Sequence, residues 1–119
     1  MASTTINVVG GIRQTATFTV NEYVSAGEFV FVQIGKVVVF RADYTMAQNI
    51  TSSAPVGFSG MPPVSDNKNV RYPDWDIEDT SDFSDNGRNF QITGNNIIRI
   101  KGEHTSGKTY RSCGVYFTT

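Results

Sequence analysis

The segment from Glu28 to Tyr44, EFVFVQIGKVVVFRADY, is the longest apolar and β-branched stretch of the chain, and only Gly35 interrupts it. Each half is long enough for a strand of about six residues. Glycine at the first central position suits a two-residue hairpin turn of the primed type, because that position requires a positive φ. The segment therefore predicts a β-hairpin.

This hairpin presents two faces, because side chains alternate along a strand. In its first arm the odd-numbered residues share one face and the even-numbered residues share the other, and both faces are mostly apolar. A hairpin that is apolar on both faces sits between two layers, within a β-sandwich or at a subunit interface. We therefore predict a contact between subunits at four residues of this arm: Phe29, Val30, Phe31 and Val32.

The composition favours strands throughout the chain. Its 119 residues include no leucine, whereas valine, threonine and glycine are plentiful. Leucine is a good helix former, while β-branched and aromatic residues favour strands. Short apolar segments bounded by turn residues recur about every ten residues. We predict an all-β fold, an antiparallel β-sandwich or jelly-roll-like barrel of about seven to nine short strands, in one domain over residues 1–119.

Other segments carry more local predictions. Regular pairing through Pro55 is possible only at the edge of a sheet, because proline has no backbone N–H. The sequence Asp85-Asn86-Gly87 is a strong turn signal. Further strands are predicted at Thr4–Val9, Gln14–Val20, Asn67–Tyr72, Arg88–Thr93, Asn96–Lys101 and Thr109–Thr118, the fourth and fifth of these forming a second hairpin.

Several classes of function are disfavoured by charge and composition. The net charge of −1 gives no basic field for nucleic acid, and no apolar run approaches the roughly 20 residues needed to cross a bilayer. The start of the chain, MASTTINVV, lacks the basic and apolar regions of a secretory leader. A metal site of histidine and cysteine ligands is disfavoured, because the chain has one histidine, His104, and one cysteine, Cys113. We expect His104 in a turn, Cys113 buried in the last strand, and no cofactor.

The acidic stretch from Asp74 to Asp85 is the main candidate site. It holds six of the eleven acidic residues and no lysine or arginine. The only tryptophan, Trp75, lies there, and an aromatic ring flanked by carboxylates can hold a sugar, the ring covering its C–H face while the carboxylates accept hydroxyl hydrogen bonds. We predict saccharide binding at Trp75, Asp74, Asp76 and Tyr72. In the alternative interpretation Trp75 anchors a long loop to the core.

Other interpretations of the acidic stretch remain open. Carboxylates suit Ca²⁺, although this stretch lacks the glycine and the final glutamate of an EF-hand loop. An ammonium group on the ligand would also suit aromatic and acidic side chains together. Hydrolysis of a glycoside needs two carboxylates at a fixed separation. Carboxylates so close in sequence on a loop are more often solvated than tuned, so we expect neither catalysis nor a bound metal.

Three stretches together resemble the C-terminal head domain of bacteriophage receptor-binding and baseplate proteins at the tail tips of phages of Gram-positive bacteria. They are FVQIGKVVVFRADYTM, VGFSGMPP and ITGNNIIRIKGEHTSGKTYRSCGVYFTT, which hold 52 of the 119 residues, and the pattern that they define extends over roughly two-thirds of the chain. The acidic stretch has no counterpart in that pattern. The resemblance implies a β-sandwich or barrel that forms the head of a longer tail protein.

The resemblance also implies a function and an assembly. Such a domain forms a homotrimer in the virion, at the tail tip or baseplate, and contacts other baseplate or tail proteins. It binds host cell-wall polysaccharide or teichoic acid in a shallow site, without catalysis. In the alternative function, the domain holds a baseplate or fibre together and touches no receptor, with apolar outer surface serving subunit contacts.

Overall fold

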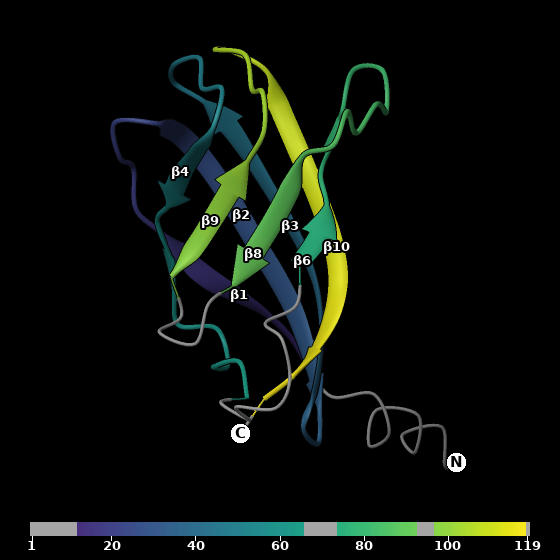
Figure 1. The fold of residues 1–119 in the computed structure, drawn as a ribbon. Coiled ribbons are helices and arrows are strands. Elements are labelled where there is room, and N and C mark those ends of the chain that lie inside the picture. The colour runs from purple at the N-terminus through teal and green to yellow at the C-terminus, as the bar shows by residue number, and fades with distance from the viewer. Residues whose placement is uncertain (1–11, 66–73, 93–96, 119) are drawn as a thin grey trace, which may run out of the picture.

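The computed structural model describes residues 12–65, 74–92 and 97–118. Within these ranges the chain forms ten β-strands, which make two antiparallel sheets (Figure 1). This confirms the predicted all-β, sandwich-like fold. The number of strands is higher than predicted, because two segments of the chain each form two short strands, one in each sheet. No helix in these ranges is long and apolar enough to cross a membrane.

The larger sheet has six strands in the order β5-β1-β2-β3-β10-β7. Its centre is made by three long neighbouring strands, β2, β3 and β10. The six strands have these bounds: β1 Arg13–Phe18, β2 Val24–Ile34, β3 Val37–Met46, β5 Phe58–Ser59, β7 Glu78–Asp79 and β10 Thr109–Phe117.

The smaller sheet has four strands in the order β4-β9-β8-β6. Pro55 lies in β4, at an edge of this sheet, as predicted. The pairing of β8 with β9 confirms the second hairpin, whereas the strands predicted at Thr4–Val9 and Asn67–Tyr72 lie outside the described residues. The four strands have these bounds: β4 Ser53–Val56, β6 Asp74–Asp76, β8 Asn89–Ile92 and β9 Ile98–Lys101.

The two sheets are joined at both edges of the smaller sheet. Strand β4 continues through Gly57 into β5, and β6 continues through Ile77 into β7, so each segment passes from the smaller sheet to the larger one. A Cβ on Gly57 would lie 2.3 Å from the carbonyl oxygen of Thr19, so glycine is required at the first crossing. Ile77 is fully buried at the second. These crossings cover strand edges that would otherwise be open to pairing.

Strands β2 and β3 form the hairpin that the sequence predicts, and Gly35 has the required positive φ of 60°. Cross-strand partners share a face, so the pairing of Phe31 with Phe40 directs one set of side chains toward the smaller sheet. Members of this set are buried: Phe29, Phe31, Val38, Phe40, Ala42 and Tyr44. Since Phe29 and Phe31 are buried within their own chain, another subunit cannot contact them. Val30 and Val32 lie on the opposite, outer face, where Val30 is also buried within its own chain and Val32 is half-buried.

His104 belongs to the core, although the sequence suggested a turn, and its side chain forms a buried polar contact. The residue is 1% exposed. Its Nδ1 lies 3.1 Å from the carbonyl oxygen of Gly102, and its Nε2 lies 2.8 Å from the hydroxyl of Tyr44. Because the carbonyl can only accept, Nδ1 carries the proton and Nε2 accepts from the tyrosine. Burial lowers the pKa of His104 to about 4, so the imidazole is neutral at neutral pH.

Candidate functional site

Trp75 faces the core and anchors β6 to the larger sheet. Its ring is half-buried and meets Phe40 edge-on, with 4.7 Å between ring centroids. It also covers Gly114 of β10, where a Cβ would lie 2.2 Å from the indole nitrogen. The contacts agree with the alternative interpretation of Trp75 as an anchor. An indole in this position does not offer an open face to a sugar.

The other predicted sugar-binding residues are not gathered around Trp75. Asp74 and Asp76 are its neighbours in β6, and alternation along the strand directs them to the other side, where both are exposed. Tyr72 lies outside the described residues. The described part of the predicted site is therefore split between the core and the surface.

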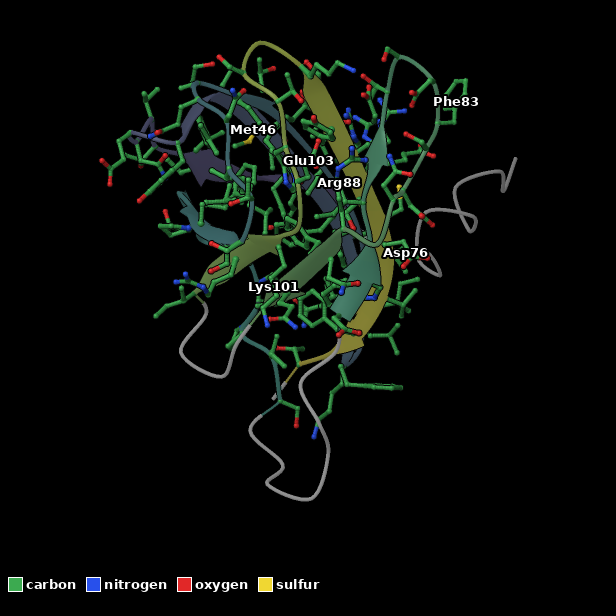
Figure 2. The ribbon with its side chains drawn as sticks, turned by 45° about the horizontal axis from the view of Figure 1, so that its top comes forward. Met46, Asp76, Phe83, Arg88, Lys101 and Glu103 are labelled. Atoms are coloured by element: carbon green, nitrogen blue, oxygen red, sulfur yellow. The ribbon has the colours of Figure 1, made fainter. Side chains whose placement is uncertain are left out.

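A hollow of about 310 Å³ lies on that surface, on the side of the molecule to which Asp76 and Phe83 belong (Figure 2). Strands β6, β7 and β10 and the loop after β7 contribute to it. Strand β6 is held against β10 there by the Ser112 hydroxyl, which donates to the carbonyl oxygen of Asp76 at 2.8 Å. Among the described residues, six line the hollow: Asp76, Glu78, Phe83, Asp85, Arg111 and Cys113.

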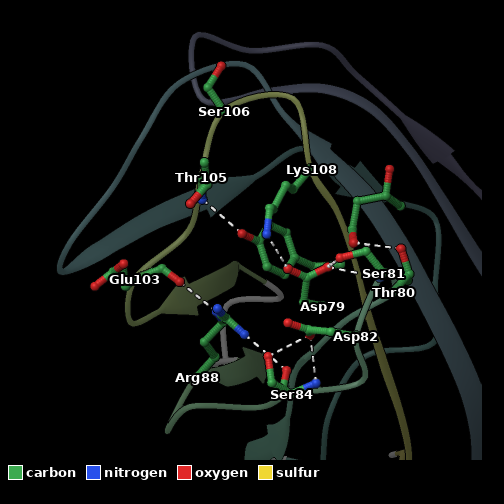
Figure 3. A network of polar contacts seen from close by, with 12 residues as sticks. Asp79, Thr80, Ser81, Asp82, Ser84, Arg88, Glu103, Thr105, Ser106 and Lys108 are labelled. Carbon is green, nitrogen blue, oxygen red and sulfur yellow. Dashed lines mark hydrogen bonds and ion pairs between the residues drawn. The ribbon is translucent and has the colours of Figure 1, made fainter.

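The loop wall of the hollow is built by the acidic stretch itself (Figure 3). Asp79 is 2% exposed and accepts hydrogen bonds from the backbone N–H and hydroxyl of Ser81 at 2.9 and 2.7 Å. Lys108 Nζ lies 2.9 Å from its other oxygen. The bonds from Ser81, followed by the contact with Lys108, hold the pKa of Asp79 far below its usual value. Asp82 accepts a similar pair of bonds from Ser84. Two of the six acidic side chains therefore shape the loop.

Arg88 fixes the base of the same loop. Its Nε donates to the carbonyl oxygen of Glu103 at 2.5 Å, and its Nη1 donates to the carbonyl oxygens of Ser84 and Asp85 at 3.1 and 3.3 Å (Figure 3). The guanidinium carbon lies 4.8 Å from the ring centre of Tyr110, in cation–π contact. The loop is thus tied at its start by Asp79 and at its end by Arg88.

Phe83 projects from this loop toward solvent (Figure 2). Its side chain is 73% exposed, and its backbone has a φ of 62°, in the left-handed region. This conformation costs a residue with a side chain roughly 1–2 kcal/mol. The backbone N–H of Phe83 donates to the carbonyl oxygen of Asp79 at 2.7 Å, which holds the strained conformation. An exposed aromatic ring in a strained position is typical of a functional loop.

The hollow is acidic in character. Arg111 is the one basic residue among those that line it, and its Nε donates to Asp43 at 2.6 Å. This hydrogen bond and the charge of Asp43 raise the pKa of Arg111. Asp43 contacts both Arg111 and Arg41, and the hollow itself holds the three carboxylates of Asp76, Glu78 and Asp85 against the one guanidinium of Arg111.

Cys113 is exposed at the hollow, contrary to the prediction that it is buried. In β10 the alternate residues Tyr110, Ser112 and Tyr116 face the core, which places Cys113 on the outer face. Partial burial is the main cause that raises the pKa of its thiol, so the thiol is protonated at neutral pH. Such a group is a poor nucleophile.

Across residues 12–65, 74–92 and 97–118, no cluster of three or more histidine, cysteine or acidic side chains is arranged to hold a metal ion. Comparison with known protein families, with curated proteins and with solved structures finds no match to this chain. The structure therefore defines an all-β, sandwich-like protein with an acidic hollow beside one exposed aromatic ring, and its function has to be argued from that hollow.

Proposed function

We propose that this protein binds a saccharide in the hollow beside Phe83 and serves, without catalysis, as a receptor-binding domain of a phage tail or baseplate. The observation that carries the proposal is the exposed ring of Phe83 at the rim of a hollow lined by three carboxylates. The sequence predicted an aromatic ring among carboxylates at Trp75, and in the structure Phe83 is the ring that has this arrangement. The ligand would be a polysaccharide or teichoic acid of the host cell wall.

The chemistry of the hollow suits a sugar ring. Phe83 offers an apolar face for the C–H groups of the ring, and Asp76, Glu78 and Asp85 offer oxygens that accept from hydroxyl groups. The volume of about 310 Å³ is at the lower end of the range for ligand pockets. A shallow site of this size fits part of a long polymer that is bound repeatedly by many copies of a weak module.

The negative charge of the hollow limits which chemical groups a ligand can place there. Three carboxylates repel a phosphate backbone, and they attract an ammonium group, which can also lie against the face of Phe83. Among wall polymers the hollow therefore favours neutral or amino-bearing sugars, and a teichoic acid would bind through an amine substituent.

Binding of purified wall polysaccharide by the intact protein tests the proposal. Phe83→Gly removes the ring and fits the positive φ, so the variant is expected to fold and to lose binding at least tenfold. The matched control is Val20→Gly, which removes an exposed apolar side chain away from the hollow. Equal binding by Phe83→Gly and the parent would refute this site.

The proposal includes the partners that the family resemblance implies: other baseplate or tail proteins, and two further copies of this chain in a homotrimer. The second candidate function is a structural domain of the baseplate or fibre that touches no receptor. It is favoured by the apolar part of the outer face of the larger sheet. A protein that assembles but binds no wall saccharide would favour this second function.

A further inference from the structure

The outer face of the larger sheet is apolar at the end near the Gly35 turn. Cross-strand register defines two apolar rows across β2, β3 and β10. Four of their side chains, Ile34, Val39, Val115 and Phe117, are 45–65% exposed. The outer face of an antiparallel sheet that meets water normally carries polar side chains. We call these rows the apolar surface, and they consist of Val32, Val39 and Val115 in one row and Ile34, Val37 and Phe117 in the other.

The same face is charged at its other end, and the charges alternate in sign. Arg41 lies 3.3 Å from Glu28 and 3.1 Å from Asp43, and Arg111 lies 2.6 Å from Asp43. The side chains of both arginines are more than 40% exposed. A band in which positive and negative groups alternate can lie against its own copy with little like-charge repulsion. Phenylalanine and arginine are also enriched at protein interfaces.

We propose that the apolar surface is covered by the same surface of another copy of this chain. Apolar rows then meet apolar rows, and the charged bands lie beside one another at the far end, as expected for a self-complementary contact between two copies, which differs from the head-to-tail contact that a homotrimer requires. The edges of the larger sheet offer less to an added strand, because β5 pairs with two residues of β1 and β7 pairs with two residues of β10.

The area of the face is consistent with this contact. Three strands at about 4.8 Å spacing and about seven residues at 3.4 Å each give roughly 340 Å² in projection, or roughly 700 Å² for two copies. Side-chain relief adds to the accessible area, which brings the contact to the low end of specific interfaces. We therefore expect an association that depends on protein concentration.

Sedimentation of the intact protein over a wide concentration range tests the proposal. The parent is expected to form dimers, and Val39→Lys, with its charge in the centre of the apolar surface, is expected to shift the protein to the monomer. Val20→Lys, an exposed valine outside this face, is the matched control and should assemble as the parent does. Circular dichroism and thermal unfolding confirm that each variant folds.

Mixing two variants of opposite charge tests whether like surfaces meet. Val39→Lys and Val39→Glu should each be monomeric alone and should associate with one another when mixed, because the two residues lie close together in a contact between like surfaces. A monomeric parent, or assembly that survives Val39→Lys, overturns the proposal. The proposal is also overturned if the parent is monomeric and assembles only after residues 1–11 are removed. In that case the N-terminal segment of the same chain would cover the apolar surface. The outcome is independent of saccharide binding, which is measured at Phe83.

Discussion

Acidification tests the buried contact between His104 and Tyr44. The side chain of His104 is 1% exposed, and burial lowers its pKa from 6.5 to about 4. Between these two values the unfolded chain binds a proton that the folded protein does not bind. The free energy of unfolding is therefore highest above pH 6.5 and falls as the pH drops toward 4.

The expected loss follows from the size of the shift. A difference of about 2.5 pKa units, at 1.36 kcal/mol per unit, corresponds to about 3 kcal/mol. This is a large part of the 5–15 kcal/mol that stabilises a typical domain. Asp79 acts in the same sense but at lower pH, because its pKa is lowered from 3.8 and its contribution is lost only as the pH falls below that value.

Chemical denaturation at a series of pH values, followed by the fluorescence of Trp75, measures this loss. The half-buried indole is the only one in the chain, so its signal reports one environment. His104→Gln keeps a polar side chain that does not titrate, and it should abolish most of the pH dependence between 6.5 and 4. If the parent shows no loss of stability in this window, or if His104→Gln loses as much as the parent, His104 is not the group whose buried, neutral state causes the pH dependence.

Three further predictions use the same denaturation assay. Gly114→Ala places a Cβ 2.2 Å from the Trp75 indole nitrogen and should lower stability by about 1–3 kcal/mol with a shift in tryptophan emission; an unchanged stability and spectrum would contradict this contact. Phe83→Gly should raise stability by up to about 1 kcal/mol, because it removes left-handed strain and loses little buried area; lower stability would show that the ring packs inward. Lys108→Met should move acid unfolding to higher pH, because after the bonds from Ser81 the contact with Lys108 does most to lower the pKa of Asp79; an unchanged acid midpoint would contradict this.

The regular part of the fold could be predicted from local patterns. The apolar run around Gly35 forms the hairpin, and Pro55 lies in an edge strand, because turn geometry and the missing N–H of proline act within a few residues. The predicted strand number was too low, because Ile77 and Gly57 are crossings between sheets. A crossing depends on the three-dimensional closure of the sheets and leaves no periodic signal in the sequence.

The candidate site was only partly predictable. The acidic stretch and the idea of a ring among carboxylates could be found from the sequence, and Asp76 does line the hollow. Which ring is exposed depends on packing, because Trp75 fills the space over Gly114 while Phe83 is carried outward on a loop. The one available signal for Phe83 was its place among turn-forming Asp and Ser residues, where a large apolar side chain has little to pack against.

The most direct test of the proposed function is an NMR titration of the isotope-labelled protein with glucosamine-containing and N-acetylated fragments of a Gram-positive cell wall. We expect backbone signals of Phe83, Glu78 and Arg111 to shift in the parent, more strongly with the amino sugar, and these shifts to disappear in Phe83→Gly. Shifts confined to another surface, or equal shifts in Phe83→Gly, would contradict binding in the hollow.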